Sequence, residues 1–397
     1  MDTVRILMIA PEPFFEPRGT PFSEFHRIRA LTTLGHEVDL VTYPFGQSVS
    51  MPGLRIFRSA RPPFVRRVTI GPSLAKVPLD ALLALTAFRR AFTGDYDAVH
   101  SHEEGGLIGV CLAGLMRVPH LYDMHSSLPQ QLTNFAFSGS RLLQRIFQWI
   151  ERLMIRQSEA VIVICPSLDD TVRAIQRDAR TVLIENAPGA GDSVASPADA
   201  AAIRSQHGIG AATPLVVYTG TFEAYQGLDL LFDAMAIVRP HRPDARLLLA
   251  GGNPEQVSVA KARAAAAGIG DVTMFAGDRP AGEIPAYLLA ADVLVSSRSR
   301  GTNTPLKIYQ YLRAGRPIVA TRLLTHTQVL SDDTAILTGV TPDEFAAGVL
   351  AAIEDRERAA RVGAGAKALA ESKYSDEAYI ARTREAVSLL RPGPSTA

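Results

Sequence analysis

Residues 293–321 decide the fold that we predict for this chain, and they read VLVSSRSRGTNTPLKIYQYLRAGRPIVAT. Residues 293–295 are consecutive branched apolar residues, a pattern typical of a parallel strand that is buried on both faces. A polar segment follows, and then a helix whose apolar residues share one face; they are Ile308, Tyr311 and Leu312. Residues 318–320 begin a second buried strand. Strand, loop, helix and strand in this order predict a parallel α/β sheet.

The helix in this stretch carries a positive charge at the end where the helix dipole disfavours it. Thr304 is a good N-cap, Pro305 suits the first helical position, and Gly315 suits the position after the helix. Lys307 then lies in the first turn, where a cation costs about 0.3–1 kcal/mol. An anion bound at this N-terminus would reverse the sign of that interaction. Lys307 therefore marks either an anion site or a surface lysine whose stem packs against apolar neighbours.

The length and the composition indicate a cytoplasmic protein of two domains. Single cores stop growing near ~250–300 residues, and this chain has 397 residues. It is 47% hydrophobic and 20% charged with a net charge of +1, which argues against a disordered chain and against a nucleic-acid-coating protein. Its two cysteines, Cys111 and Cys165, are too few for a disulfide framework. We find neither a signal peptide nor the ~20 consecutive apolar residues that span a bilayer.

The first residues already have the pattern of a doubly wound sheet. Residues 4–10 are a buried strand, residues 21–34 have helical spacing of apolar side chains, and residues 38–43 form the next strand. Gly19 is the only glycine in the first loop, so the G-x-G-x-x-G fingerprint of dinucleotide-binding folds is absent there. This absence argues against a nicotinamide enzyme.

A second α/β series starts after a segment rich in Ala, Gly, Pro and Ser, which we interpret as a connection between two domains. We predict two doubly wound Rossmann-like domains with a cleft between them. The predicted division is an N-terminal acceptor-side domain at 1–186, a linker at 187–213, a C-terminal nucleotide-sugar-binding domain at 214–375, and a helix with a frayed tail at 376–397 that crosses back. Glycine-bounded turns at Gly220 and before Thr304 would point two helix N-termini into the cleft, which suits a diphosphate.

Polar side chains follow two strands of the first domain. His100, His102, Glu103 and Glu104 end one predicted strand, and His125 ends the next. Two histidines and two carboxylates invite a metal site, but their spacing matches no helical H-E-x-x-H pattern. Because ligands in open α/β sheets bind beyond the carboxyl ends of strands, we favour side chains that face a ligand and predict no metal.

The segment 53–90 is strongly basic, with eight basic side chains against one acidic side chain, and apolar residues lie between the charges. Such a surface suits an anionic lipid or a phosphate-bearing acceptor, so we expect contact with a membrane surface through residues 55–90. A solvated face over ordinary packing explains the same composition equally well.

Taken together and in order, these segments resemble the retaining glycosyltransferases of family four, which have the two-Rossmann GT-B fold. The resemblance covers nearly the whole chain. Residues 297–319 resemble the donor segment of that family, in which Pro305, Gln310, Gly315 and Pro317 hold the positions of its Pro, second Glu, Gly and Pro. Residues 220–231 resemble the family's Gly-Arg-x4-Lys-Gly loop, and residues 34–38 match a common Leu-Gly-His-Glu-Val segment.

The resemblance also assigns expected roles in both domains. His125 matches the donor-facing histidine, and residues 18–21 stand where the family has its acceptor loop. The predicted catalytic residues are His125, Thr302 and Gln310, and the predicted acceptor-side residues are Arg18, Gly19, Thr20 and His102. The predicted donor-binding residues are Gly220, Thr221, Gln226, Arg298, Arg300, Asn303, Thr304, Pro305, Leu306 and Lys307.

This chain departs from the family at the charged positions of both donor motifs. Thr302 and Gln310 stand where the family has its Glu-x7-Glu pair, and Thr221 and Gln226 replace the arginine and lysine of the loop. A glutamine still forms hydrogen bonds to a ribose hydroxyl, but without the strength that a carboxylate charge adds. We expect the nearby cations to hold the diphosphate instead, together with backbone N–H groups of residues 303–307; these cations are Arg298, Arg300 and Lys307.

The resemblance implies a metal-independent hexosyltransferase in polysaccharide biosynthesis. It would move a sugar with retention from a UDP- or GDP-type donor to a glycan, lipid-linked or small-molecule acceptor, without a cofactor and without nucleic acid. It would work in the cytoplasm or at the inner face of the membrane. Two alternatives stay open: a nucleotide-sugar epimerase of the same fold, and a catalytically silent relative that binds nucleotide sugars, since four motif charges are missing.

Overall fold

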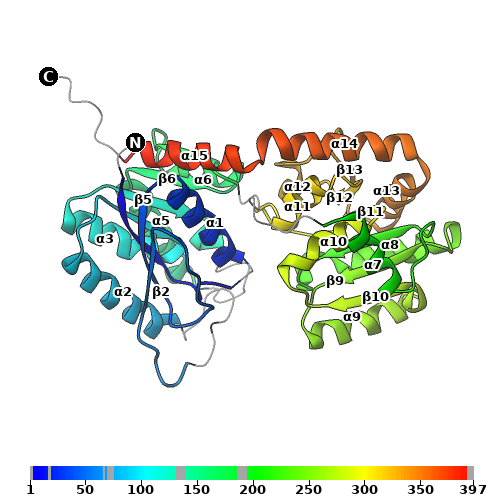
Figure 1. The fold of residues 1–397 in the computed structure, drawn as a ribbon, viewed down its shortest axis with the longest axis horizontal. Helices are drawn as coiled ribbons and strands as arrows, with labels where there is room; N and C mark the ends of the chain where they lie inside the picture. Colours follow the sequence, from blue (N-terminus) through cyan, green and yellow to red (C-terminus); the bar gives the residue numbers. More distant parts are fainter. Residues whose placement is uncertain are drawn as a thin grey trace. The chain divides into compact units, whose positions relative to one another are not determined.

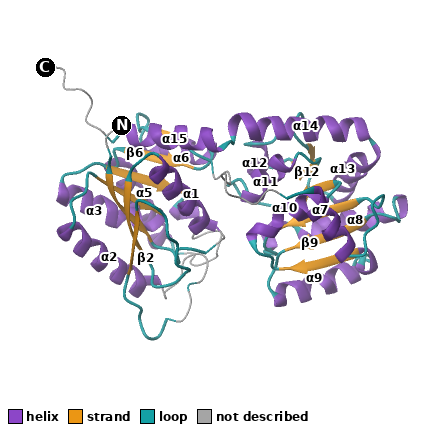
Figure 2. Ribbon diagram, viewed as in Figure 1, coloured by secondary structure: helices purple, strands orange, loops and turns teal. Residues whose placement is uncertain are grey.

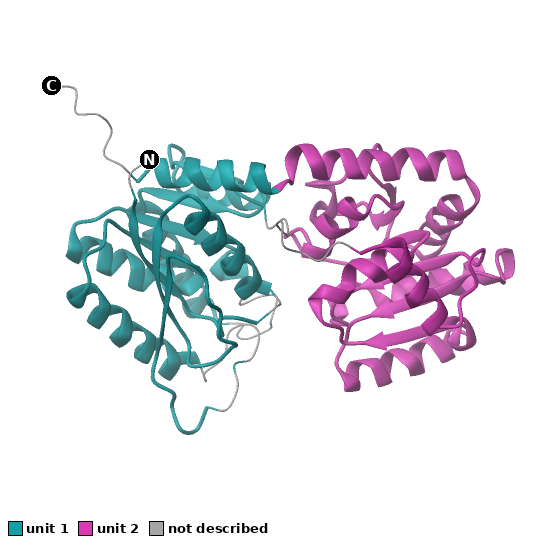
Figure 3. Ribbon diagram, in the orientation of Figure 1, with its two compact units in different colours: residues 1–186, 376–397 teal, residues 187–375 magenta. Residues whose placement is uncertain are grey.

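The computed structural model describes residues 3–16, 19–65, 68, 76–130, 140–185 and 195–390. The chain divides into two compact units, which Figure 3 shows in different colours. Unit 1 comprises Met1–Asn186 and Asp376–Ala397, and unit 2 comprises Ala187–Ser375. In the part of the chain that is described, no helix combines the length and the apolar character that a membrane span needs.

Unit 1 is a seven-stranded parallel sheet between two layers of helices (Figure 1). The strands lie in the order β3-β2-β1-β4-β5-β6-β7. They are β1 (Arg5–Ala10), β2 (Glu37–Thr42), β3 (Leu54–Arg58), β4 (Ala98–His102), β5 (His120–Met124), β6 (Ala160–Val163) and β7 (Thr181–Leu183). The helices are α1 (Gly19–Thr33), α2 (Lys76–Thr93), α3 (Gly106–Met116), α5 (Arg141–Gln157), α6 (Pro166–Ile175) and α15 (Asp376–Ser388).

Successive side chains of a unit 1 strand point to opposite faces of the sheet, so each strand packs against both layers of helices. On one face, Ile6 and Met8 of β1 pack in a cluster with residues of α1 and α15. On the other face, Leu7 and Ile9 pack with residues of α2 and α3. Both faces are therefore covered at β1, which is why residues 6–10 are a continuous apolar run.

Unit 2 repeats this architecture with a six-stranded parallel sheet in the order β10-β9-β8-β11-β12-β13 (Figure 2). Its strands are β8 (Leu215–Thr219), β9 (Arg246–Ala250), β10 (Thr273–Gly277), β11 (Val293–Ser296), β12 (Ile318–Thr321) and β13 (Ile336–Thr338). Its helices are α7 (Pro197–Gln206), α8 (Leu228–His241), α9 (Pro254–Ala266), α10 (Ile284–Ala290), α11 (Leu306–Ala314), α12 (Leu324–Thr327), α13 (Pro342–Glu354) and α14 (Arg356–Lys373). The predicted fold class, two doubly wound parallel domains, is confirmed.

Two segments that we predicted to be connections, the linker and the end of the first loop, are helical in the structure. The expected linker at 187–213 contains α7, which packs against α10 in unit 2. A capping box starts this helix: the Ser196 side chain accepts from the Asp199 N–H and the Asp199 side chain accepts from the Ser196 N–H. The first loop is also shorter than expected, since α1 begins at Gly19 rather than near residue 21.

Two helices, α14 and α15, are the last of the described chain and are separated at Tyr374 and Ser375; α15 starts at the residue predicted for the helix that crosses back. Tyr374 is buried, and its ring lies edge-on to that of Tyr309, with 5.0 Å between the centroids. This contact fixes the end of α14 in unit 2. The next residues, from Asp376, belong to unit 1, as expected for a helix that crosses back.

Candidate functional site

The candidate site of unit 2 lies at the carboxyl ends of its strands, where two glycines bring neighbouring loops together. Gly220 follows β8 with φ +124°, and Gly251 follows β9 with φ +134°. A Cβ atom added at Gly251 would lie 1.9 Å from the carbonyl oxygen of Gly220. The close approach and the positive φ values both require glycine.

The loop after β8 is also attached to the end of β11. Gly227 has φ +71°, and a Cβ atom there would lie 2.0 Å from the carbonyl oxygen of Ser297. The Ser297 hydroxyl donates to the carbonyl oxygen of Gln226 at 3.2 Å, and the Ser299 N–H donates to that of Tyr225 at 3.1 Å. The donor loop and the donor segment that the sequence predicts are therefore in direct contact.

Lys307 carries the strongest electrostatic signal in unit 2. Its Nζ atom lies 3.7 Å from the centroid of the Tyr218 ring and 3.5 Å from the position of a Cβ atom on Gly220. The side chain is buried, and Nζ has no hydrogen-bond partner among the described residues. Burial lowers the pKa of Lys307 well below its usual value, and the nearby Arg298 guanidinium lowers it further.

A buried ammonium without an anionic partner is costly, so its surroundings indicate what it binds. The Tyr218 ring compensates part of this cost through a cation–π contact. In the described part of the chain, no carboxylate forms an ion pair with Lys307. The ammonium lies beside the N-terminus of α11, where backbone N–H groups also favour an anion. The site therefore suits a phosphate or diphosphate.

The structure corrects the start of α11. We predicted Thr304 as the N-cap, but Pro305 holds this position with extended backbone (ψ 136°), and the helix begins at Leu306. The Thr304 hydroxyl is buried and has no hydrogen-bond partner among the described residues. Lys307 is thus the second residue of the helix. Thr304 is left free to donate to a ligand, a role that capping would have excluded.

The other predicted donor-binding residues divide into two groups. Arg298 organises the loop itself: its Nη1 atom donates to the Asn303 carbonyl oxygen at 2.6 Å and to the Thr325 hydroxyl at 2.7 Å. Arg300 and Thr221 are exposed to solvent. Of the predicted cations, only Lys307 and Arg298 are therefore held inside the site.

Thr302 and Gln310, the predicted catalytic residues of unit 2, are both half-buried. The Thr302 carbonyl oxygen accepts from the Gln328 side chain at 2.5 Å, which fixes the loop before α11. Gln310 lies one helical turn after Lys307 on α11. In the loop after β8, Gln226 is buried, and its Oε1 atom has no hydrogen-bond partner among the described residues.

Two residues of this site were not predicted. The Tyr311 hydroxyl accepts from the Thr219 N–H at 2.9 Å, which attaches α11 to β8. His326 is buried, with Nε2 2.8 Å from the Ser296 hydroxyl, and burial lowers its pKa to about 4. Tyr311 was assigned only to the apolar helix face, and no sequence pattern pointed to His326.

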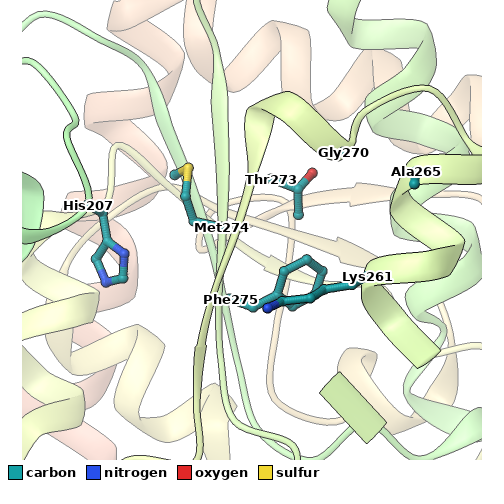
Figure 4. Close-up of a pocket in the computed structure, with 7 residues that line it drawn as sticks. All are labelled: His207, Lys261, Ala265, Gly270, Thr273, Met274 and Phe275. Carbon is teal, nitrogen blue, oxygen red and sulfur yellow. The ribbon is translucent and has the colours of Figure 1, made fainter. Parts of the chain in front are cut away.

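A separate pocket of about 530 Å³ lies along α9 and β10 (Figure 4). It is lined by His207, Lys261, Ala265, Gly270, Thr273, Met274 and Phe275. None of these residues was predicted to bind the donor. Because Lys261 gives this pocket a cation, nucleotide binding at this pocket and at Lys307 must be distinguished by experiment.

Unit 1 has a second buried polar cluster, built around Asp123 of β5. His100 and His102 of β4 approach this carboxylate at 3.5 and 3.8 Å, and His125 Nε2 approaches it at 3.2 Å. Nδ1 of His102 lies 3.2 Å from Nε2 of His125. Arg27 of α1 completes the cluster, with Nε 2.9 Å from Oδ2 of Asp123. The structure thus brings together His102 and His125, which the sequence placed on different strand ends.

The charges in this cluster follow from burial and pairing. Burial alone would raise the pKa of Asp123, but Arg27 and His125 outweigh it and hold that pKa well below its usual value. Burial lowers the pKa of His100, and that of His102 still more. The cluster therefore contains an ionised carboxylate paired with a guanidinium, next to the neutral imidazoles of His100 and His102.

Among the described residues, three members of this cluster are close enough together to hold a metal ion: His100, His102 and Asp123. One ligand atom from each of His100, His102 and Asp123 lies within 4.8 Å of the others. However, Arg27 already neutralises Asp123, and a metal would place a second buried cation beside a guanidinium. The donor set therefore suits a hydrogen-bonded network better than a metal centre.

The strand ends of unit 1 also gather carboxyl groups. Glu24 of α1 is fully buried, and both its carboxyl oxygens lack a hydrogen-bond partner among the described residues. Burial raises the pKa of Glu24 well above its usual value, and Glu12 raises it further. Burial also raises the pKa of Glu12 to about 7. Lys76 forms an ion pair with Glu104, with Nζ 2.8 Å from Oε1.

The predicted acceptor loop is only partly described. Gly19 and Thr20 are the first residues of α1, and Gly19 has φ +57°. Arg18 lies outside the described residues. The acceptor-side prediction therefore rests on the residues around His102.

Comparisons with known proteins point to one enzyme class. Residues 199–369 match the family model for glycosyl transferases group 1, and residues 26–187 match that for a glycosyl transferase 4-like domain. A phosphatidyl-myo-inositol mannosyltransferase of Mycobacterium leprae is 24% identical over 332 residues, which cover 83% of this chain and 81% of that protein.

Solved structures agree on the fold. A sucrose-phosphate synthase from Thermosynechococcus elongatus superimposes with a TM-score of 0.79 at 19% identity, covering 98% of this chain and 99% of the other. The Anabaena protein Alr3699/HepE, solved in complex with UDP, superimposes with a TM-score of 0.74 at 19% identity, covering 97% and 99%.

Proposed function

The chain belongs to the family 4-type glycosyltransferases of the GT-B fold, and from this premise we propose that it transfers a hexose from a nucleotide-diphosphate donor with retention of anomeric configuration. The observation that carries the proposal is Lys307, a buried lysine in the first turn of α11 whose Nζ atom has no hydrogen-bond partner among the described residues. A donor diphosphate would supply the missing anion.

We propose a UDP- or GDP-type donor and a glycan, lipid-linked or small-molecule acceptor. The Anabaena structure contains UDP, which supports a UDP-type donor. The mycobacterial relative is named for a phosphatidyl-myo-inositol acceptor, which supports a lipid-linked or polyol acceptor. A polysaccharide pathway would use such a reaction.

In the proposed reaction the bond between the anomeric carbon and the diphosphate oxygen breaks, and the diphosphate leaves with the bonding electrons. Lys307 and the backbone N–H groups at the start of α11 would stabilise this developing charge, and such stabilisation usually contributes most to the rate enhancement of an enzyme. Arg298 would fix the loop that positions them, and the Thr304 hydroxyl would donate to the same anion. The acceptor hydroxyl would bond to the anomeric carbon on the face that the diphosphate leaves, and its O–H bond would break with transfer of the proton to the departing diphosphate oxygen.

His125 would contact the sugar from unit 1, and Asp123 would hold its ring through the 3.2 Å approach to Nε2. Thr302 and Gln310 would contact the donor as neutral hydrogen-bonding groups rather than as carboxylates. We propose that no metal and no cofactor take part, because the cations at α11 can neutralise the diphosphate. Activity in excess EDTA tests this point.

The central experiment is calorimetric titration with UDP, GDP, ADP and their hexose conjugates. We expect one nucleotide to bind and Lys307→Ala to weaken that binding at least tenfold. The matched control is Lys261→Ala, in the pocket along α9 and β10 (Figure 4). If Lys261→Ala weakens binding and Lys307→Ala does not, the site assignment is wrong.

The nucleotide that binds then serves in an activity assay with its sugar conjugate. Slow hydrolysis of the donor, and transfer to an added acceptor with a retained anomeric signal in the NMR spectrum, would support the proposal. Conversion of the donor sugar without an acceptor would identify an epimerase. Tight binding with neither reaction would identify a silent relative, and binding of no nucleotide would sink the transferase proposal.

A further inference from the structure

The basic segment that the sequence suggested for membrane contact uses much of its charge inside unit 1. Arg55 and Arg90 both form ion pairs with Asp39, at 2.6 and 3.2 Å. Lys76 forms its ion pair with Glu104. These side chains stabilise the fold, and they do not present free charges to a bilayer. The expected surface at residues 55–90 therefore has less available charge than its composition indicated.

Helix α5 (Arg141–Gln157) has the opposite character. Four arginines of this helix are exposed, and among the described residues none of their guanidinium groups forms a hydrogen bond or an ion pair; they are Arg141, Arg145, Arg152 and Arg156. The acidic residue of α5, Glu151, is buried, and its carboxylate accepts from the Leu128 N–H at 2.8 Å. The outer face of α5 thus carries positive charge and no acidic side chain.

The same face exposes large apolar side chains. Leu142 is 69% exposed, Ile146 is 42% exposed, and Trp149 is 61% exposed. Their spacing of four and three residues places them in one stripe along the helix. The core-facing side of α5 is separate: Met154 and Ile155 are buried in a cluster with residues of β5 and β6. The stripe is therefore not part of the packing that holds α5 on unit 1.

The arginines and the apolar stripe lie side by side. At about 100° per residue, the four arginines fall within an arc of about 60°, and Trp149, Leu142 and Ile146 fall within the adjoining arc of about 60°. A helix with an apolar stripe, flanking arginines and an aromatic residue at the boundary is typical of helices that lie in a membrane interface. A helix face that binds another protein would more often carry both acidic and basic side chains.

We propose that the outer face of α5 docks on an anionic lipid bilayer, with Leu142, Ile146 and Trp149 among the acyl chains and the arginines on headgroup phosphates. The arginine stems can lie along the apolar boundary while the guanidinium groups reach the phosphates. This docking does not depend on the proposed sugar transfer. It would bring unit 1 to the surface where a lipid-linked acceptor is found.

The chain contains a single tryptophan, Trp149, so the natural protein reports on the proposed surface directly. We would titrate it with vesicles of phosphatidylcholine containing phosphatidylglycerol, and with vesicles of phosphatidylcholine alone. The expected result is a blue shift of the emission with the anionic vesicles, quenching by brominated acyl chains, and weaker binding at high salt. Arg145→Gln should lower vesicle partitioning about fivefold.

Matched variants separate docking from general surface effects. Arg361→Gln removes an exposed arginine of α14 in unit 2 and should leave partitioning unchanged. Ile146→Ser should lower partitioning at least fivefold, whereas Val259→Ser, at a 62% exposed position of α9, should not. Circular dichroism of each variant checks that it is folded. If an apolar variant does not fold, the comparison of Arg145→Gln with Arg361→Gln still tests the proposal.

Three outcomes would overturn the proposal. Equal binding to neutral and anionic vesicles would remove the role of the arginines. An unshifted emission at saturating anionic lipid would show that Trp149 stays in water. A blue shift without vesicles, accompanied by dimers in sedimentation velocity, would show that a second copy of the chain covers α5 instead.

Discussion

Nε of Arg27 lies 2.9 Å from Oδ2 of Asp123, and both side chains are buried almost completely. The two residues are 96 positions apart in the sequence, on α1 and β5. The Arg27 Nη1 atom also donates to the Thr383 hydroxyl of α15 at 3.3 Å. One guanidinium thus joins a strand end to two helices on the same face of the unit 1 sheet.

Removing one partner of this ion pair should be costly. Asp123→Asn leaves the Arg27 charge buried without compensation, and we expect the free energy of unfolding to fall by about 3–5 kcal/mol. Urea unfolding measures this. The control is Asp271→Asn at the exposed pair Asp271–Arg239, which should cost less than about 1 kcal/mol. Equal losses in the two variants would contradict the buried-charge argument.

The pH dependence of that pair has a definite sign. The pKa of Asp123 is held below its value in the unfolded chain, so the pair stabilises unit 1 above the unfolded pKa. This stability is lost as the pH falls through the lowered pKa of the folded state. The unfolding free energy of Asp123→Asn should therefore depend less on pH in the acidic range than that of the natural chain.

Diphosphate binding should take up protons at Lys307. Its pKa is lowered in the free site, chiefly by burial, and a bound anion would raise it again. Affinity should then fall as the pH rises from the lowered pKa of the free site to the higher pKa of the complex. Calorimetry over a series of pH values, each in two buffers of different ionisation enthalpy, measures the uptake. Lys307→Met should abolish it, and Lys261→Met should not; uptake that persists in Lys307→Met would refute the assignment.

Alanine substitutions at two glycines distinguish the cost of a steric contact from the cost of a left-handed backbone. Gly227 and Gly268 have nearly equal φ values, +71° and +74°, but only Gly227 is in close contact, with the Ser297 carbonyl oxygen. Gly268→Ala should cost about 1–2 kcal/mol for the left-handed backbone alone. Gly227→Ala should cost roughly 1–3 kcal/mol more and weaken nucleotide binding. Urea unfolding and calorimetry measure the two effects, and equal stability losses would contradict the contact.

Glu12 should make the natural chain less stable at neutral pH than in mild acid. Burial raises its pKa from about 4.5 to about 7, so the folded state binds more protons than the unfolded state over this interval. The unfolding free energy then decreases as the pH rises from about 4.5 to about 7. Glu12→Gln should flatten this part of the profile, whereas Glu371→Gln, at an exposed position, should not. A profile unchanged in Glu12→Gln would show that another group is responsible.

Strands β11 and β12 of unit 2 could be predicted from the sequence because each is a continuous apolar run between clear breaks. The predicted strand at 293–295 and the predicted strand start at 318 agree with β11 and β12 as observed. By contrast, β3 (Leu54–Arg58) is a partly exposed edge strand in which arginines alternate with apolar residues. Because of its charges we interpreted this segment as a lipid-binding surface, and we did not recognise the alternating pattern of a strand.

The site of unit 2 was more accessible to sequence reasoning than that of unit 1. The position of Lys307 in a first helical turn predicted an anion site from one local rule, and the structure places this lysine beside Gly220. The Arg27–Asp123 pair had no such rule, because its partners are distant in sequence. The Glu24 carboxyl group was hidden for the same reason, as its burial depends on how α1 packs against the strand ends.

The last helix of the chain has a consequence for synthesis on the ribosome. Tyr379, Ala386 and Val387 of α15 are part of the core that β1 and α1 build at the other end of the sequence. The first part of unit 1 therefore emerges before unit 2 but lacks one of its covering helices until unit 2 has been made. All of unit 2 is made in the meantime, as a self-contained insertion between the two parts of unit 1. Of the two units, the one whose synthesis starts earlier can therefore complete its fold only after the other has been made.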